Sequence, residues 1–317
     1  MPDPATPEQI RRAAERIQPI AARTPVLTSR TFDAAAGVSA YFKCENLQRG
    51  GSFKIRGAAN FVFSIDPRKL PNGVVAYSSG NHAQAVAIAA EFVGAPATLV
   101  MPQDAPQSKV EATRAHGAKI VLYDRLVESR EEIGRRIAEE TGATLVPPYD
   151  HSWTITGQGT AALELLEQAP ELDALIAPVG GGGLLSGCAI AARNLLPKIR
   201  IFGAEPEDAN DTFLSLRAGK RVQIPPPATL ADGLRATKPG ELTFPVIQRL
   251  AEDVLLVSED EIRTAVKFLL SRLKILVEPS GAVPAAAVLC GKLPKDIRTI
   301  GVILSGGNVD FSILASL

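Results

Sequence analysis

Apolar and polar positions follow one another along this chain in blocks that predict strands and helices in regular succession. Short apolar runs bounded by turn residues predict buried strands, and the longer segments between them carry the helical period. The expected strands are 74–77, 97–101, 119–123, 174–179, 199–204 and 299–304; the expected helices open at Thr6-Pro7 and span 82–93, 108–116, 127–140, 157–168 and 185–195. Alternation of this kind predicts an α/β fold of parallel-type sheets covered by helices. Because it runs once before and once after Pro147-Pro148, we expect two lobes with a ligand cleft between them.

Composition narrows the class of protein. Of 317 residues, 46% are hydrophobic, which suffices for a substantial core. The 34 basic and 34 acidic residues balance, so neither nucleic acid nor an anionic membrane is an expected partner. The N-terminus lacks the basic and apolar regions of a signal peptide, and no apolar run approaches the roughly 18 residues of a membrane span. Three scattered cysteines without metal-ligand spacing suit a reducing, cytoplasmic location.

Lys54 has unusual neighbours for a lysine. Phe53 and Ile55 flank it, and glycines lie close on both sides. The ordinary alternative is a solvated surface charge, as for most lysines. Desolvation, however, disfavours the ammonium and frees the amine as a nucleophile. Such an amine forms Schiff bases with carbonyl compounds, pyridoxal phosphate among them.

Four consecutive glycines, Gly180, Gly181, Gly182 and Gly183, follow an expected buried strand and open an expected helix. Their backbone can pack closely around an anion, and the free N–H groups at a helix start point toward it. A flexible linker is the alternative, although linkers do not usually join a buried strand to an apolar helix. The spacing matches neither the dinucleotide fingerprint nor the P-loop, so a monophosphate cofactor fits better.

Two other expected strand ends carry polar turns. In 78–82 the sequence Ser-Ser-Gly-Asn-His precedes a helix, where hydroxyls, the amide and the helix N-terminus can bind a carboxylate or a cofactor oxygen. Plain turn chemistry is the alternative, and His82 alone reads as structural. In 304–308, Leu-Ser-Gly-Gly-Asn makes Ser305 a candidate ligand contact.

Together these motifs resemble the fold-type II pyridoxal-phosphate enzymes, specifically the serine/threonine dehydratase and serine racemase family. The resemblance runs from about Thr24 to the C-terminus. The matching segments, in order, are GSFKIRG (51–57), SSGNHAQ (78–84), GQGT (157–160), the four glycines, GAEP (203–206), ADGL (231–234), EPSG (278–281) and LSGGN (304–308). The resemblance implies a two-lobed fold like that of the tryptophan synthase β chain, with the cofactor in the cleft. It assigns residues 1–70 plus 149–317 to a large cofactor domain and 71–148 to a small, mobile substrate domain.

The resemblance also implies residue roles. Lys54 would carry the cofactor as a Schiff base and take the substrate α-proton. The other implied cofactor contacts are Phe53 beside the ring, Asn81 at the ring 3-oxygen, Gly180 to Gly183 at the phosphate, Ser305 at the pyridine nitrogen, and Gly233 and Glu278 around the ring. Ser78, Ser79, Asn81 and His82 would bind the substrate carboxylate. Arg130 either reaches a second substrate carboxylate or stays solvated on its charged helix.

The implied reaction is loss of ammonia from a β-hydroxy amino acid (L-serine, L-threonine or L-threo-3-hydroxyaspartate) by α-proton abstraction and β-elimination. Ser79 favours racemisation instead, because in racemases a serine there serves as the acid–base group opposite the lysine, here Lys54. The segment 146–151 looks more like threonine dehydratases. Two less favoured hypotheses are a β-replacement enzyme and a non-catalytic amino-acid or nucleotide-binding protein. The family resemblance implies a homodimer.

An acidic loop at 205–211 resembles the cation loop of the racemase group. The Glu205 and Asp211 carboxylates and the Ala209 carbonyl would bind Mg²⁺ (or Ca²⁺ or Mn²⁺), with waters completing the shell. A solvated acidic loop is the alternative. With only three histidines in the chain, a histidine-based metal site is not expected.

Overall fold

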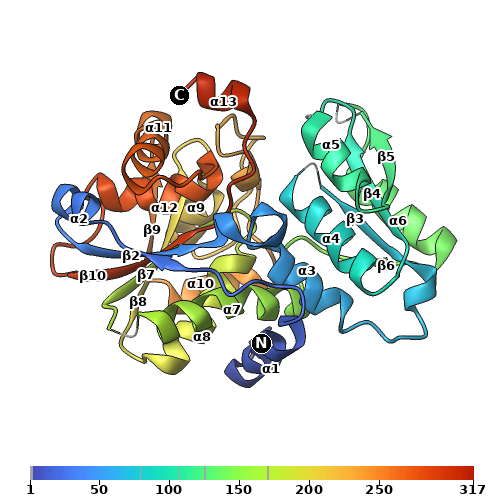
Figure 1. Cartoon of the computed structure of the whole chain (residues 1–317), viewed down its shortest axis with the longest axis horizontal. Coiled ribbons are helices and arrows are strands. Elements are labelled where there is room, and N and C mark those ends of the chain that lie inside the picture. Colours follow the sequence, from blue (N-terminus) through green and yellow to red (C-terminus); the bar gives the residue numbers. More distant parts are fainter. Residues whose placement is uncertain (1–2, 79, 106, 125, 170) are drawn as a thin grey trace.

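The strands of this chain form two separate sheets, each in a lobe of its own (Figure 1). The computed structural model describes residues 3–317 apart from positions 79, 106, 125 and 170 and the side chains of 107–109. The large lobe holds six strands in the order β1 (Val26–Leu27), β2 (Ser39–Cys44), β10 (Thr299–Leu304), β7 (Ala174–Pro178), β8 (Arg200–Pro206) and β9 (Asp253–Val257). The small lobe holds β5 (Lys119–Tyr123), β4 (Ala97–Pro102), β3 (Val74–Tyr77) and β6 (Thr144–Leu145). The predicted parallel pairing is confirmed in both sheets, except that edge strand β1 runs antiparallel to β2.

Helices cover both faces of the large sheet, because successive strand residues such as Leu175 and Ile176 point to opposite sides and both are buried. One face packs against α2 (Arg30–Ala36), α11 (Glu259–Phe268) and α12 (Pro279–Leu289). The other packs against α1 (Pro7–Ile17), α7 (Ser152–Gln168), α8 (Gly183–Leu195) and α10 (Thr243–Leu250). Two short helices remain. Helix α9 (Asp211–Ala218) follows β8, and helix α13 (Phe311–Ala315) lies near the C-terminus.

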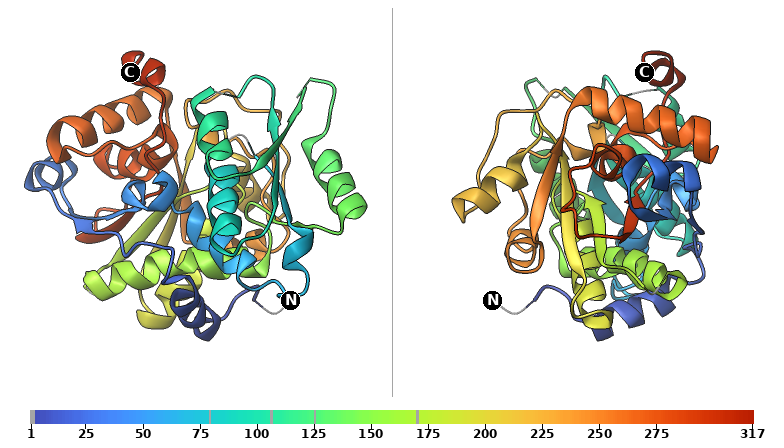
Figure 2. Two further views of the ribbon diagram at one scale, coloured as in Figure 1. Left: turned by 45° about the vertical axis from the view of Figure 1, so that its right-hand side comes forward. Right: turned by 90° about the vertical axis from the view of Figure 1, so that its left-hand side faces the viewer.

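The small lobe repeats the arrangement on a smaller scale. Helices α4 (Asn81–Phe92) and α5 (Gln107–Arg114) share one apolar cluster with β3 and β4. Helix α6 (Arg130–Thr141) packs on the opposite face through Ile133. Figure 2 shows this lobe standing beside the large one. The predicted domain boundaries and the mobility of residues 71–148 stay predictions.

Most predicted elements are confirmed to within a few residues, including the helix at Pro7, where Thr6 and Gln9 form the expected capping box. Two starts were wrong. Helix α6 begins at Arg130 rather than Val127 because Ser129 caps it, accepting a hydrogen bond from the Glu132 N–H. Helix α7 begins at Ser152 rather than Gly157, because the His151 ring caps its first turn. None of the described helices has the length and apolarity needed to cross a bilayer.

The helix that begins with Lys54, α3 (Lys54–Val62), was not predicted. Its start has no side-chain cap, and Gly57 lies in its first turn, so the sequence gives neither a start signal nor a strong helix propensity there. The helix packs against α7 of the large lobe and α4 of the small lobe (Figure 1). The short turns left over are Glu45–Leu47, Arg49–Gly51, Leu70–Asn72 and Asp232–Leu234, with a π turn at Leu269–Leu273.

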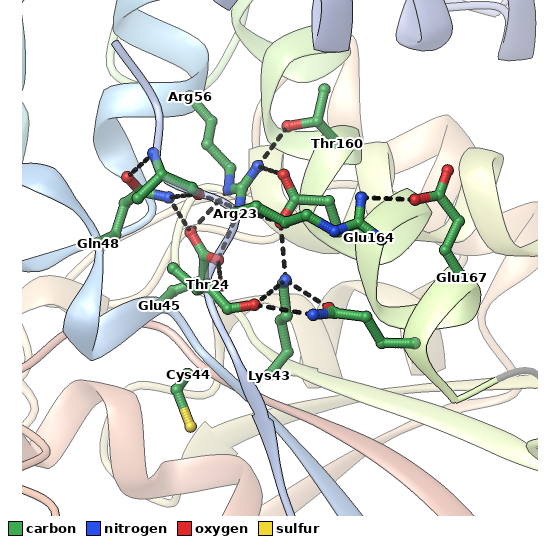
Figure 3. Close-up of polar contacts among 12 residues, drawn as sticks. Arg23, Thr24, Lys43, Cys44, Glu45, Gln48, Arg56, Thr160, Glu164 and Glu167 are labelled. Carbon is green, nitrogen blue, oxygen red and sulfur yellow. Dashed lines mark hydrogen bonds and ion pairs between the residues drawn. The ribbon is translucent and has the colours of Figure 1, made fainter. Parts of the chain in front are cut away.

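A buried ion network anchors α3 (Figure 3). The Arg56 guanidinium donates to both oxygens of Glu45 at 2.7 and 2.8 Å, and to both oxygens of Glu164 at 2.8 Å each. Lys43 donates to Glu164 at 2.7 Å and to the Thr24 carbonyl at 2.7 Å. The Thr24 hydroxyl in turn donates to Glu45 at 2.6 Å. Two cations and two anions therefore cancel, and their hydrogen bonds join the N-terminal segment, β2, α3 and α7.

Charge balance makes this burial tolerable. Arg56, Lys43 and Glu45 are fully buried. Burial alone would lower the pKa of Arg56, but the carboxylates of Glu45 and Glu164 outweigh it and raise that pKa. Burial would also raise the pKa of Glu164, yet its bonds to Arg56 and Lys43 lower it instead. Each charge depends on the others, since an unpaired charge in this setting is strongly destabilising.

We expect Arg56→Met to lower the free energy of unfolding by about 3–5 kcal/mol, because it leaves Glu45 and Glu164 buried without their cation. Urea unfolding of the cofactor-free protein measures it. Arg23→Ala is the control: it removes an ion pair to Glu167 that is 2.7 Å long but about half exposed, and should change less than about 1 kcal/mol. Equal losses in the two variants would contradict the anchoring role.

Candidate active site

The predicted site residues gather at the carboxyl ends of parallel strands in the two sheets. Ser305 follows β10, the four glycines follow β7, and Asn81 comes just after β3. The carboxyl ends of parallel strands in an open α/β sheet are the usual place for ligands. Residues from distant segments touch there: the Phe53 N–H donates to the Ser305 carbonyl at 3.0 Å, and Ser52 forms a β-bridge with Gly306.

The Lys54 amine lies against Pro148, in the segment between β6 and α7. Its Nζ donates to the Pro148 carbonyl at 3.0 Å and lies 5.2 Å from the centre of the Phe53 ring. Desolvation lowers the pKa of Lys54 to about 8, and the negative charge of Glu278 offsets this in part. At neutral pH about one amine in ten is then unprotonated, against roughly one in several thousand for a free lysine.

The glycine loop is held in shape by side chains packed against it. A Cβ on Gly181 would lie 2.4 Å from the Tyr149 ring, so a larger residue cannot occupy this position unless the ring moves. The Thr243 hydroxyl donates to the Gly181 carbonyl at 2.7 Å. Helix α8 starts at Gly183 with no side-chain cap, so the N–H groups of its first turn are available to an anion. The loop therefore has the form of a phosphate cradle.

The ring-side residues are joined by direct bonds. The Asn81 amide donates to Glu278 Oε1 at 2.7 Å, and the Gly233 N–H donates to the Ser280 hydroxyl at 2.9 Å. Glu278 and Ser305 are almost fully buried. The site thus combines a nucleophilic amine, an anion cradle and a buried serine beside one carboxylate, a set that fits an aldehyde-bearing monophosphate such as pyridoxal phosphate.

The His82 side chain is an uncharged ring, so it cannot bind a carboxylate as a cation would. Its Nε2 lies 2.9 Å from the Val146 carbonyl, which only accepts, so Nε2 carries the proton. Burial lowers the pKa of His82 to about 3, with the charge of Lys54 adding to the effect. The ring is therefore neutral and offers only an acceptor at Nδ1. Any hydrogen bond from His82 to a carboxylate comes from its backbone N–H.

Ser78 and Arg130, two other predicted substrate residues, lie near the end of β3. Ser78 directly follows Tyr77, the last residue of β3. The Arg130 guanidinium lies 5.8 Å from the Tyr77 ring centre and donates to Glu131 at 2.8 Å, with its side chain about half exposed. Burial would lower the pKa of Arg130, but Glu131 outweighs this effect and raises it. Ser79, the predicted second acid–base group, lies outside the described residues.

Sequence reasoning assigned no role to several residues of this site. Asn308 was part of a motif, but its contacts to Asn81 come from a distant loop. Tyr149 and Thr243 contact the glycine loop without any local pattern that could have announced it. The Pro148 carbonyl could not be anticipated at all, because only its position in space makes it the acceptor for Lys54.

The acidic loop holds two buried carboxylates. Glu205 accepts from the N–H groups of Thr212 and Phe213 at 3.2 and 2.9 Å, and is fully buried. Both oxygens of Asp211 are buried without a hydrogen-bond partner among the described residues. Burial raises the pKa of Asp211 to about 7, and burial together with Asp211 raises that of Glu205. Burial therefore disfavours the ionised form of both carboxylates.

Few side chains of this loop are placed to hold a metal ion. Among the described residues, no group of three or more His, Cys, Asp or Glu side chains is arranged to hold a metal ion. Only two of the loop's four carboxylates, Glu205 and Asp211, are buried, so further ligands would have to include carbonyl and water oxygens.

Comparison with known proteins identifies relatives of this arrangement. Residues 17–306 match the model of the family described as pyridoxal-phosphate dependent enzyme. The chain is 50% identical over 306 residues to an L-threo-3-hydroxyaspartate ammonia-lyase of a Pseudomonas species, covering 96% of both chains. It is 47% identical over 310 residues to a serine racemase of Oryza sativa subsp. indica, covering 96% of this chain and 91% of the relative.

Solved structures of serine racemases have the same fold as this chain. The structure of maize serine racemase matches with a TM-score of 0.95 at 48% identity, covering 98% of this chain and 96% of that one. The serine racemase of Dictyostelium discoideum matches with a TM-score of 0.91 at 46% identity, covering 97% of this chain and 99% of that one. The predicted fold-type II architecture is thereby confirmed.

We expect the cofactor-free protein to form its Schiff base with pyridoxal phosphate at a rate that rises with pH up to about 8 and then levels off. Only the neutral amine attacks, and burial of Lys54 moves its titration down from the usual lysine range. Stopped-flow absorbance measures the rate. Lys54→Ala should abolish the visible band, whereas Lys69→Ala, at an exposed position, should leave the profile unchanged. A rate still climbing at pH 10 would contradict the desolvated amine.

Proposed function

This chain belongs to the pyridoxal-phosphate dependent enzyme family, and we propose that it is an ammonia-lyase acting on β-hydroxy amino acids, foremost L-threo-3-hydroxyaspartate. The observation that carries the choice of substrate is its 50% identity, over 96% of this chain, to hydroxyaspartate ammonia-lyases of a Pseudomonas species and of Saccharomyces cerevisiae. The products would be a 2-oxo acid and ammonia. L-Serine and L-threonine are the other substrates proposed.

The residues of the cleft fit pyridoxal phosphate. We propose that Lys54 carries it, that Gly180 to Gly183 hold its phosphate, and that Asn81 donates to its ring 3-oxygen. Phe53, Gly233 and Glu278 line the ring. When bound, the cofactor withdraws electron density from the substrate α-carbon and so makes its proton acidic.

Lys54 then serves as the base. Its lowered pKa leaves a fraction of the amine neutral at physiological pH, ready to take the α-proton at Nζ. Ser305, which is 3% exposed, would face the pyridine nitrogen with a neutral hydroxyl in place of a carboxylate. A neutral partner does not favour a protonated ring, so negative charge at the α-carbon is short-lived and departure of the β-hydroxyl is favoured.

Substrate selection would rest on two carboxylate sites. Ser78, Ser79, the His82 backbone and the N-terminus of α4 would bind the α-carboxylate. Arg130 would bind the second carboxylate, a role supported by its place beside Tyr77 at the end of β3. Hydroxyaspartate has that second carboxylate and serine does not, so Arg130 would distinguish the two.

We expect Arg130→Ala to lower kcat/KM on L-threo-3-hydroxyaspartate by roughly tenfold to a hundredfold, the size of a lost hydrogen bond between charged groups. Activity on L-serine should change little. Release of 2-oxo acid measures both. Arg136→Ala, an exposed arginine of the same helix, is the control. Equal losses on both substrates would remove the proposed role of Arg130, and cofactor binding without turnover of any β-hydroxy amino acid would refute the lyase proposal.

Serine racemase activity is the second candidate, alone or beside elimination. It is supported by the serine at position 79 and by the 47% identity to a plant serine racemase. Ser79 would return a proton to the face opposite Lys54 and so invert the α-carbon. D-Serine, measured in the same incubation as the 2-oxo acid, distinguishes the activities; racemisation without elimination would overturn the leading proposal.

We propose that Glu205, the Ala209 carbonyl and Asp211 bind Mg²⁺, with Ca²⁺ or Mn²⁺ as substitutes. The support is chemical: buried carboxylates whose pKa values are raised by burial gain most from a hard cation, and Asp211 has no described partner for either oxygen. The ion would stabilise the loop between β8 and α9. A homodimer and a cytoplasmic location are also proposed, on the family resemblance and the free cysteines.

We expect Mg²⁺ at about a hundred times its Kd to stabilise the protein by about 2.7 kcal/mol, and EDTA to reverse the gain. The shift in Tm measures it. Asp211→Asn should abolish the response, while Asp208→Asn, an exposed carboxylate of the same loop, should retain it. A Tm indifferent to both Mg²⁺ and EDTA would leave the loop without a metal.

A further inference from the structure

Asn308 lies between the two lobes and contacts both. Its amide nitrogen donates to the Gly50 carbonyl at 2.7 Å, in the large lobe. The same nitrogen donates to the Asn81 side-chain oxygen at 2.9 Å, in the small lobe, and lies 3.4 Å from Gln84 Oε1. Asn81 extends this series of hydrogen bonds, because its nitrogen donates to Glu278 Oε1 at 2.7 Å. The bonds thus run from Gly50 through Asn308 and Asn81 to Glu278.

Both ends of this relay are acceptors, and that fixes the direction of everything between them. A side-chain amide has a donor end and an acceptor end that are nearly equal in shape, so only its partners decide which way it points. The Gly50 carbonyl can only accept, so Asn308 must turn its nitrogen there. Asn308 then donates from the same nitrogen to Asn81, and the Asn81 side-chain oxygen accepts. The nitrogen of Asn81 is left to face Glu278.

We propose that Asn308 is a positioning residue that sets the orientation of the Asn81 amide, so that its NH₂ end and not its oxygen is offered to the cofactor. An amide nitrogen carries two hydrogens, and among the described residues Glu278 accepts one from Asn81. The other is the donor for the ring 3-oxygen. With the amide turned over, an acceptor would face that oxygen instead and would repel it.

The packing around Asn308 is consistent with a built relay. Gly51 has a φ of +70°, and a Cβ placed on it would lie 2.2 Å from Asn308 Oδ1, so this position is kept clear for the amide. Both bonds of Asn81 cross from the small lobe to the large one. The orientation of a cofactor contact in the small lobe is therefore dictated by a loop of the other lobe, after β10.

This inference rests on the cofactor site proposed above, so that site is tested first. The wild-type holoenzyme should show the visible absorption of the lysine-bound cofactor, and Lys54→Ala should lack it. A failure at this stage concerns the site itself and not Asn308.

The test compares Asn308→Asp with Asn308→Ala. Aspartate keeps the shape but has only acceptors, so it opposes the Gly50 carbonyl and draws the Asn81 nitrogen away from Glu278. Alanine removes the donor to the Asn81 oxygen and leaves the bond to Glu278 to hold the direction of the Asn81 amide, so that direction is less firmly set. Absorption spectra and cofactor titration should therefore rank wild type above Asn308→Ala, and Asn308→Ala above Asn308→Asp. For Asn308→Asp we expect cofactor affinity to fall by about tenfold or more and part of the visible band to move to the near ultraviolet, since the anionic ring oxygen loses its donor.

Asn46→Asp is the matched control. Asn46 also donates its amide to a backbone carbonyl nearby, that of Leu276 at 2.9 Å, but among the described residues no bond links it to Asn81. It should keep the wild-type spectrum and an affinity within about twofold, on the scale where tenfold is about 1.4 kcal/mol. Tm values of the cofactor-free variants separate loss of fold from loss of orientation.

Three results would overturn the proposal: an unchanged spectrum in Asn308→Asp, an equal effect of Asn46→Asp, or a larger loss in Asn308→Ala than in Asn308→Asp. If Asn308→Asp does not fold, Asn308→Ala decides alone. A folded Asn308→Ala with the wild-type band and affinity rejects the proposal, and one with a weakened band supports it.

Discussion

The buried charge of Arg56 governs the geometry of the site. A guanidinium without water requires carboxylates at hydrogen-bond distance, and Glu45 and Glu164 supply them from the end of β2 and from α7. Arg56 lies two residues beyond Lys54 on the same helix. The ion network therefore holds the start of α3 between the lobes and determines where the amine of Lys54 can reach.

The chemistry of the cleft follows from the same exclusion of water. Desolvation lowers the pKa of Lys54 and of His82, which leaves a reactive amine beside a neutral imidazole. It also strengthens each remaining hydrogen bond, so the direction of an amide such as Asn81 matters more than it would at the surface. In the acidic loop the same effect raises the pKa of Asp211.

Where sequence reasoning succeeded, the signal was local. The glycines after β7, the polar turn after β3 and Lys54 between apolar neighbours each announce their chemistry within a few residues. Helix α3 was not predicted because no capping side chain marks its start and Gly57 lies in its first turn. The starts of α6 and α7 were displaced because a single capping side chain, Ser129 or His151, outweighs the apolar pattern around it.

The order of amino acids was enough to establish the alternation of strands and helices, the cofactor class through its motifs, and the residues that could bear the chemistry. These depend on chain-local properties: side-chain period, backbone freedom and functional groups at strand ends. The folded chain was needed to show that Pro148 faces Lys54, that Tyr149 closes on the glycine loop and that Asn308 meets Asn81. Those contacts join residues as many as 227 positions apart. Hydrogen-bond direction and desolvation exist only once such partners have been brought together in space.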